Sequence, residues 1–171
     1  MYTRESKLPF AVYAYAASVL ARGVAAGRAG GGMTRDEAET MLRALVGDEA
    51  GAPLLGGGGV AGVMLGAAAL FFEYDAGRGA LWCGALVYRF RNRPRPGVLE
   101  AFFEEGRGAG SGCLVYREET RSLLLGRTYF EVMPGEEFAG EMKRLAAASL
   151  GWGAEVLERV ASRHERDASS S

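Results

Sequence analysis

The chain has 171 residues, of which 49% are hydrophobic and 24% charged, and its formal net charge at pH 7 is −1. This composition excludes a disordered chain, and the near-neutral charge argues against a polyanion as the main partner. At this length one domain buries about two-thirds of its unfolded surface without needing a disulfide or a metal. We therefore expect a single domain over residues 1–171.

An apolar stretch from Leu8 to Ala21 follows Arg4 and Lys7 and has two interpretations. Basic residues before a short apolar run fit a signal peptide, although about 14 residues are too few to span a bilayer. Apolar side chains also recur at three- and four-residue steps, at Phe10, Tyr13, Ala17, Leu20 and Val24. Because that spacing is typical of a helix packed on its own domain, we prefer a buried helix over residues 8–26, followed by a linker that ends at residue 33.

A second helix is predicted from Thr34 to Gly47. The Thr34 hydroxyl can cap its first turn, and Asp36 and Glu37 suit the positive end of the helix dipole. Residues 47–59 are expected to form a loop that ends in four consecutive glycines. The next segment, Val60 to Leu65, is either a short strand or an irregular lead-in to the following strand.

Two β-hairpins and an intervening short helix are predicted next. The first hairpin joins residues 68–74 to 80–91, the short helix runs from Val98 to Glu105, and the second hairpin joins residues 113–117 to 122–132. Large apolar side chains lie on both faces of these strands, whereas a sheet with one covered face shows regular apolar and polar alternation. We therefore expect each face of the sheet to contact something.

A long amphipathic helix is expected from Gly135 to Arg163, followed by a polar tail over residues 164–171. Its apolar stripe from Phe138 to Val160 predicts that it lies across the sheet. Gly151 and Gly153 indicate a kink, because glycine weakens a helix interior. Together the elements predict an α+β fold in which an antiparallel sheet packs against a long C-terminal helix, with an extra N-terminal helix.

The sequence predicts no catalytic, cofactor or metal site. Gly57, Gly59 and Gly62 match G-x-G-x-x-G, but too few residues precede them for a parallel strand, and no acidic residue sits about 20 positions beyond in a βαβ unit, as a dinucleotide site requires. His164 is the sole histidine and lies in the polar tail. Neither a catalytic triad nor a metal-ligand pattern forms around it.

Two charged groups have both a functional and a structural interpretation. Glu73 and Asp75 point to the same side of one strand, about 6–7 Å apart, as two catalytic carboxylates would. We interpret them instead as a solvated strand end beside a turn. The four arginines within residues 89–95 could bind phosphates or an acidic protein, and we interpret them as a solvated strand end as well.

The two cysteines, Cys83 and Cys113, lie inside apolar strand patterns, where a free cysteine behaves as a small hydrophobic residue. A disulfide between them would require neighbouring strands, and two cysteines do not make the framework of a secreted protein. We therefore expect a reducing compartment, the cytoplasm.

The order of elements resembles a known family. The order is helix, strands, short helix, two strands and long helix, with Leu-x-Phe-x-Tyr-Asp at residues 70–75 and the run from Phe138 to Trp152 in the last helix. Over residues 34–163 this pattern is similar to the CesT/Tir-type chaperones of type III secretion. The YbjN-like proteins share this fold and remain an alternative. A third hypothesis is a small α+β enzyme or ligand-binding domain with a pocket between sheet and closing helix.

The resemblance implies a small non-catalytic homodimer in the cytoplasm that holds a secreted effector in extended form, without ATP or another cofactor. Neither nucleic acid nor a membrane is expected as a partner. A short helix cannot bury both Phe102 and Phe103 on one face, so the dimer interface is expected at Val98, Leu99, Phe102 and Phe103. The client is expected to contact apolar sheet surface at Leu70, Phe72, Leu123 and Leu125. The N-terminal helix, the glycine-rich loop and the near-neutral charge depart from the family pattern.

Overall fold

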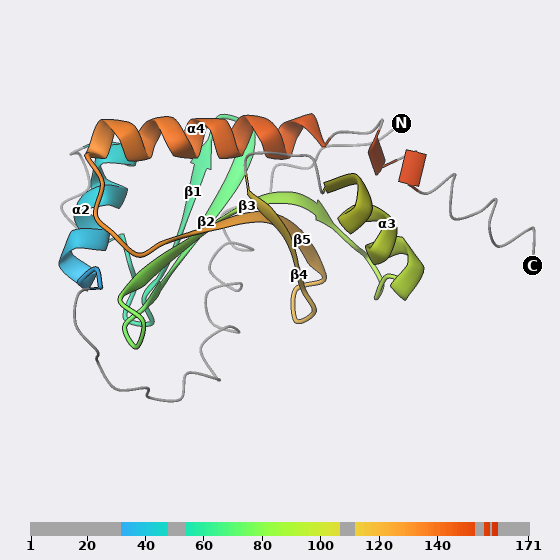
Figure 1. Cartoon of the computed structure of the whole chain (residues 1–171), viewed down its shortest axis with the longest axis horizontal. Coiled ribbons are helices and arrows are strands. Elements are labelled where there is room, and N and C mark those ends of the chain that lie inside the picture. Colours follow the sequence, from blue (N-terminus) through green and yellow to red (C-terminus); the bar gives the residue numbers. More distant parts are fainter. Residues whose placement is uncertain (1–31, 48–53, 107–111, 153–155, 158, 161–171) are drawn as a thin grey trace, which may run out of the picture.

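The structure is a computed structural model that describes residues 32–47, 54–106, 112–152, 156–157 and 159–160. Within these ranges, five strands form one antiparallel sheet and a long helix lies across it (Figure 1). This architecture confirms the predicted α+β fold with its sheet packed against a C-terminal helix. The helix predicted over residues 8–26 and the tail over residues 164–171 lie outside the described residues.

The first described helix, α2 (Arg35–Val46), begins at the predicted cap. The Thr34 hydroxyl accepts a hydrogen bond from the Glu37 amide at 3.3 Å, and the Glu37 carboxylate accepts one from the Thr34 amide at 2.7 Å. This capping box satisfies two N–H groups that have no partner within the helix. Gly47 ends the helix at φ 80°, where glycine is favoured because it has no Cβ.

The strand order in the sheet is β1-β2-β3-β5-β4, and neighbouring strands are antiparallel. The strands are β1 (Val60–Leu65), β2 (Ala68–Asp75), β3 (Ala80–Arg89), β4 (Cys113–Arg117) and β5 (Ser122–Tyr129). Both predicted hairpins are present, and residues 60–65 form a strand rather than a lead-in. Strands β3 and β5 end at Arg89 and Tyr129, short of the predicted ends at residues 91 and 132.

Helices α3 (Pro96–Gly106) and α4 (Gly135–Gly151) complete the described elements. The predicted closing helix is interrupted, because α4 ends at Gly151 with Trp152 as its C-cap. The predicted end at Arg163 lies outside the described residues. Glycine costs about 1 kcal/mol relative to alanine inside a helix, which explains a boundary at this pair of glycines. Residues 156–157 and 159–160 are again helical.

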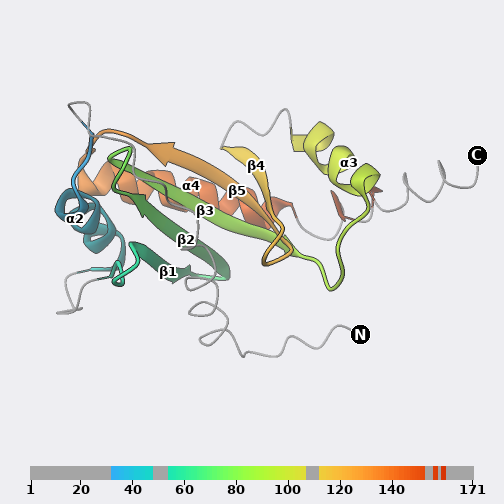
Figure 2. The ribbon, with the colours of Figure 1, turned by 90° about the horizontal axis from the view of Figure 1, so that it is seen from below.

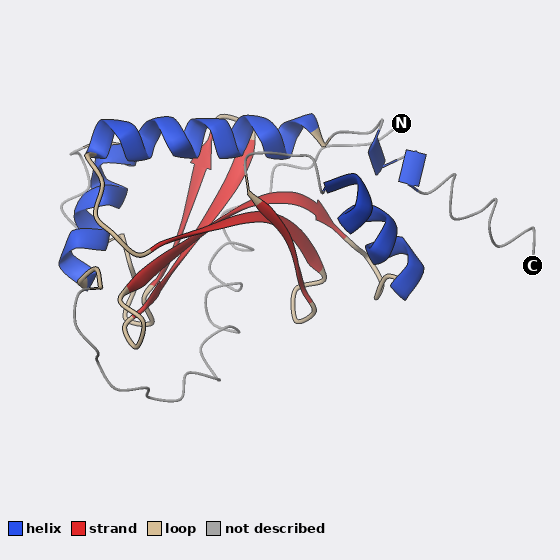
Figure 3. Cartoon of the chain, viewed as in Figure 1, coloured by secondary structure: helices blue, strands red, loops and turns tan. Residues whose placement is uncertain are grey.

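Helix α4 lies across one face of the sheet, with α2 beside it (Figure 3). We call this the helix face. The rings of Phe72 on β2 and Phe138 on α4 lie 6.4 Å apart, and Tyr129 on β5 lies 5.6 Å from Phe138. Full burial of such side chains contributes about 1.5–3 kcal/mol each. A smaller cluster joins α3 to the sheet through Phe102, Leu123 and Trp152.

Candidate functional site

The opposite side of the sheet carries an apolar cluster that no described helix covers; in Figure 2 the strands lie in front of α4. We call this surface the second face, and it consists of Ala69, Phe71, Trp82, Leu86 and Leu124. Ala69, Phe71 and Leu124 are buried, and the other two are half-buried. These residues alternate with the core residues of their strands, so the two-residue period of a strand turns them away from α4.

Trp82 lies flat on the second face because two paired glycines leave room for it. A Cβ added at Gly84 would lie 2.1 Å from Cη2 of Trp82, and a Cβ at Gly126 would lie 2.9 Å from ring atoms of the same indole. Gly84 and Gly126 are register partners on β3 and β5. The indole therefore fills the space that side chains at both positions would take. Glycine inside a strand is a sequence signal of such close approach, but neither Gly84 nor Gly126 was predicted to mark a site.

An ion pair between Glu73 and Arg117 closes over this tryptophan. Arg117 Nη2 donates to Glu73 Oε2 at 3.2 Å, and Arg117 Cζ lies 4.7 Å from the centroid of the Trp82 ring. The two charged residues lie on β2 and β4, three strand spacings apart, which is about 14 Å in a flat sheet. The contact therefore requires a curved sheet whose second face is concave, and the strands in Figure 1 arch in this way.

A hollow of about 460 Å³ opens beside Trp82 at edge strand β4. Its lining residues are Trp82, Gly112, Cys113, Val115, Gly126, Arg127 and Thr128. Among the described strands, β4 pairs only with β5, so its outer edge keeps main-chain groups that another strand can bind. An extended peptide can pair with such an edge and place alternate side chains in an adjacent hollow.

The four residues predicted to contact a client lie in the interior. Leu70 and Phe72 are 1% exposed, and Leu123 and Leu125 are 0% exposed. Leu70, Phe72 and Leu125 pack in the cluster beneath α4, and Leu123 packs with Phe102 and Trp152. Client contact through these four stays a prediction, and it would require the core to open. The uncovered apolar surface that motivated it lies one residue away along the strands, on the second face.

The four residues predicted at a dimer interface lie on α3. Phe102 is buried, with its ring centroid 6.2 Å from that of Trp152, and 36% of Phe103 is exposed. Val98 and Leu99 are half-buried. The expectation that one phenylalanine turns outward therefore agrees with the geometry, while the dimer itself stays a prediction.

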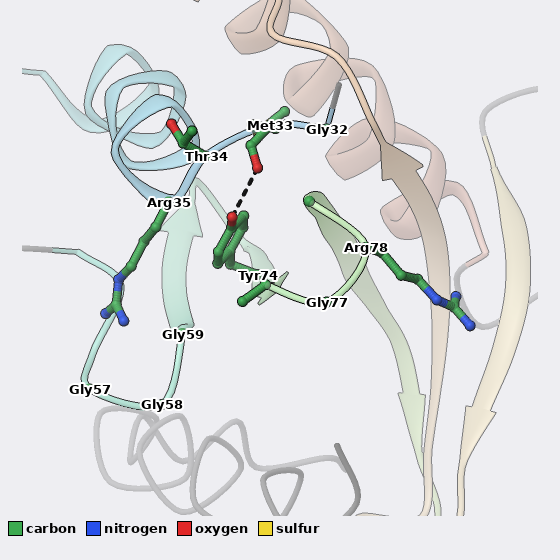
Figure 4. A pocket seen from close by; sticks show the side chains of 12 residues that line it. Gly32, Met33, Thr34, Arg35, Gly57, Gly58, Gly59, Tyr74, Gly77 and Arg78 are labelled. Atoms are coloured by element: carbon green, nitrogen blue, oxygen red, sulfur yellow. Dashed lines mark hydrogen bonds between the residues drawn. The ribbon is translucent and has the colours of Figure 1, made fainter. Parts of the chain in front are cut away.

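A second hollow, of about 550 Å³, lies between the start of α2, the glycine-rich loop and the β2–β3 turn (Figure 4). Its polar groups have partners within the chain. Arg35 Nη2 donates to the Leu55 carbonyl at 3.0 Å, and Arg78 Nε lies 3.7 Å from the Asp75 carboxylate. The first turn of α2 already receives the Glu37 carboxylate, so an incoming phosphate would have to displace it.

The residues weighed for chemistry from the sequence lie apart in the structure. Gly57 and Gly59 line the hollow of Figure 4, whereas Gly62 lies within β1 opposite Phe71. Glu73 pairs with Arg117, as described above, and Asp75 Oδ1 accepts from the Gly77 amide at 2.9 Å. The two carboxylates thus hold a concave sheet and a turn, and they do not face a shared substrate position.

The arginine-rich segment at residues 89–95 follows β3 and is mostly exposed. Arg93 Nη2 lies 2.7 Å from a carboxylate oxygen of Glu118. Within the described part of the chain, no ion pair involves Arg89, Arg91 or Arg95. The segment leads into α3 and lies outside the second face.

Three residues of the sheet, Cys83, Tyr116 and Tyr129, have a raised pKa without a catalytic arrangement. Burial raises the pKa of the Cys83 thiol well above its usual value, and burial raises the pKa of Tyr129 to about 12. Cys83 and Cys113 are both free, and β5 separates their strands. The condition for a disulfide between them, neighbouring strands, is therefore not met.

The described residues contain neither a metal-binding cluster nor a membrane-spanning helix. Among them, no group of three or more His, Cys, Asp and Glu side chains is placed to hold a metal ion. No described helix has both the length and the apolar character needed to cross a bilayer.

No protein-family model matches the sequence, and no curated protein matches it. Among solved structures, the chain is similar to the crystal structure of the ExsC–ExsE complex, with a TM-score of 0.55 and 15% identity over 70% of this chain and 93% of that one. It is also similar to the HopA1–SchA chaperone–effector complex, with a TM-score of 0.48 and 19% identity over 67% of this chain and 88% of that one. The first similarity shows a fold shared with a chain of that complex, in agreement with the fold predicted from the sequence.

Proposed function

We propose that this protein is a non-catalytic chaperone, a cytoplasmic homodimer that holds a segment of a secreted effector in extended form. The observation that carries the proposal is the concave apolar second face, which no described helix covers. The fold supports it, because the similar ExsC–ExsE structure is a complex of two proteins. Holding an unfolded segment needs no base, nucleophile or cofactor, so we propose no enzymatic activity.

An extended segment suits the second face for two reasons. Its side chains alternate, so those at every second position can contact Phe71, Trp82 and Leu86 while the others face solvent. Its main chain can also pair with the outer edge of β4. The apolar area removed from water contributes about 25 cal/mol per Å², which offsets part of the entropy lost on ordering the client.

The proposed homodimer depends on α3. Phe103 is exposed on this helix while Phe102 anchors it to Trp152, so Phe103 and its half-buried neighbours Val98 and Leu99 are free to contact a second subunit. In such a dimer each subunit contributes its own second face, so one client chain can contact both subunits. Once the client is bound to one subunit, its binding to the other subunit is intramolecular, which raises the overall affinity without any new contact.

The experiment is client capture followed by affinity measurement. The full chain would be used to co-purify partners from the native host, and protease mapping would define the protected segment of the dominant partner. We expect one secreted protein with a single protected stretch. Titration of that purified segment would then compare the wild type with Val115→Asp, which places a charge in the hollow beside Trp82. We expect Val115→Asp to weaken binding at least tenfold.

A matched control keeps the charge and changes the surface. Leu150 on α4 is 49% exposed, so Leu150→Asp introduces the same side chain away from the second face and should bind the segment as the wild type does. Circular dichroism would show that both variants are folded. Equal affinity of Val115→Asp and Leu150→Asp would contradict binding at this surface, and failure to recover any protein client would contradict the chaperone function.

A further inference from the structure

The second face has buried residues although no described helix covers it. Its cluster includes Phe71 at 8% exposure and Leu124 at 0%, although α2 and α4 pack on the other side of the sheet. Only Trp82 and Leu86 of this cluster are half-buried, and the apolar surface that they leave in water favours association. The helix face is filled by its own core, with Phe72 and Phe138 no more than 1% exposed, so of the two faces of the sheet only the second can receive an additional apolar segment.

The chain enters the described structure at the β2–β3 turn, on the rim of the sheet, where Met33 is buried in the cluster beneath α4. The Met33 amide donates to the Gly79 carbonyl at 2.8 Å, and the Tyr74 hydroxyl donates to the Met33 carbonyl at 2.9 Å. A Cβ at Gly32 would lie 2.9 Å from the Gly79 backbone, so this entry point is closely packed onto the β2–β3 turn. Trp82 is three residues beyond Gly79 along β3, which is about 10 Å.

The preceding 31 residues include a segment of suitable length and pattern. Residues 8–26 have apolar side chains at helical spacing, and 19 residues in a helix extend about 28 Å. Five strands are about 19 Å wide from the first to the last, so such a helix can cross the sheet. The glycine-rich linker from Gly27 to Gly32 can extend up to about 20 Å, which is enough to bring the segment from the rim onto the second face.

We infer that residues 8–26 of the same chain dock on the second face and compete there with the client. The inference of competition rests on the proposed function, whereas the docking does not. A short flexible linker gives an effective concentration of about 1 mM or more. A tethered segment at that concentration keeps the apolar surface covered until a client that binds more tightly displaces it.

The test uses the full chain and two tyrosines of the segment. Tyr13 belongs to the apolar stripe, and Tyr15 is turned about 200° away from it at 100° per residue. Tyr13→Asp should therefore undock the segment, whereas Tyr15→Asp changes the same residue type on the opposite side. Native-state trypsin cleavage after Arg22 reports docking, because a docked segment must open before it is cleaved. Leu86→Asp perturbs the same contact from the sheet.

We expect cleavage after Arg22 to be at least tenfold faster in Tyr13→Asp and in Leu86→Asp than in the wild type, with Tyr15→Asp unchanged. The Trp82 emission should shift to the red in Tyr13→Asp, while Trp152 lies in a separate cluster and gives a constant background. Equal cleavage rates in the wild type and Tyr13→Asp would overturn the docking. Protection that is lost on dilution would overturn it as well, because it would assign the cover to a second copy.

The client segment provides a separate reading of the competition. If docking leaves only a fraction of molecules open, the apparent dissociation constant is raised by the inverse of that fraction. We therefore expect Tyr13→Asp to bind the client at least tenfold more tightly than the wild type, and Tyr15→Asp to bind it equally. An unchanged affinity in Tyr13→Asp would overturn the competition. Failure to find a client would bear on the proposed function and leave the cleavage result standing.

Discussion

The Glu37 carboxylate accepts hydrogen bonds from both the amide and the hydroxyl of Thr34, at 2.7 and 2.9 Å. The bond from the Thr34 amide is the main reason that the pKa of Glu37 lies below its ordinary value of 4.5. A carboxyl whose pKa is lowered in the folded state stabilises the fold at a pH above its ordinary pKa. This stabilisation is lost as the pH falls from the ordinary pKa through the lowered pKa of the folded state.

Glu37→Gln is therefore expected to lower the melting temperature at pH 7, because glutamine keeps an acceptor oxygen but loses the charge at the helix start. The difference from the wild type should shrink as the pH falls below 4.5. Melting curves between pH 3 and pH 7 measure this. Glu131→Gln removes one exposed charge outside any cap and should show no such trend, and a Glu37→Gln difference that grows in acid would contradict the assignment.

A substitution at Gly84 tests the packing of the Trp82 ring against the sheet. A Cβ at this position would lie 2.1 Å from the indole, so Gly84→Ala must displace the ring from the second face. We expect a loss of about 1–3 kcal/mol in the free energy of unfolding, the usual cost of overpacking. In a Trp82→Ala background the same substitution should cost less, because the clashing ring is absent.

The matched control for Gly84 is Gly140 in α4, where an added Cβ meets only Arg144 Nη1 at 3.8 Å. Gly140→Ala should raise the free energy of unfolding by about 0.5–1 kcal/mol, since alanine suits a helix interior better than glycine. Urea unfolding measures both changes. An equal cost of Gly84→Ala with and without Trp82 would show that the indole is not the group displaced.

At the scale of single elements, α3 buries Phe102 and exposes the adjacent Phe103. Phe103→Glu should leave the chain folded and convert the proposed dimer to a monomer, since the exposed ring at a subunit contact is replaced by a charge. Phe102→Glu should unfold the chain, because Phe102 is 3% exposed and a buried unpaired charge is strongly destabilising. Light scattering at micromolar concentration, with circular dichroism as the check on folding, measures both.

Val132 provides the control for Phe103, since it is an apolar residue, 49% exposed, outside α3. Val132→Glu should stay dimeric. A wild-type protein that is monomeric, or a Phe103→Glu variant that stays dimeric, would place the subunit contact elsewhere or remove it.

The elements themselves could be read from the sequence to a large extent, and their boundaries less well. Thr34, the turn glycines and the two strand pairs give local signals, so the capped helix and both hairpins were predictable. The end of α4 was predicted only as a kink at Gly151 and Gly153, because the apolar stripe continues past Gly151 and does not show that the helix stops there. The period of two along β2 and β5 also shows which residues share a face, but not which face α4 covers. The predicted client residues therefore fell on the helix face.

At the scale of the whole molecule, the curvature of the sheet could not be predicted from local pattern. The contact between Glu73 and Arg117 joins residues 44 positions apart across β3 and β5, and nothing in the spacing of either residue indicates it. The fold class was predictable because the order of elements alone specifies it. The concave shape that makes the second face a candidate binding surface is a property of the folded sheet.

The chemistry of client binding follows from which surface the client uses. The second face is apolar, and its charged neighbours Glu73 and Arg117 already neutralise each other. In the segment at residues 89–95, by contrast, only Arg93 has an ion-pair partner among the described acidic residues. Binding at the second face should show a negative heat-capacity change, the mark of apolar burial. Its affinity should change less than about threefold between 0.05 and 0.5 M salt, a range over which exposed charges become screened. Calorimetric titration of the client segment at several temperatures and salt concentrations measures both quantities. A steep fall of affinity with salt and a heat-capacity change near zero would instead place the client on the arginines, because salt weakens binding that depends on exposed charges. The second face would then have no part in client recognition.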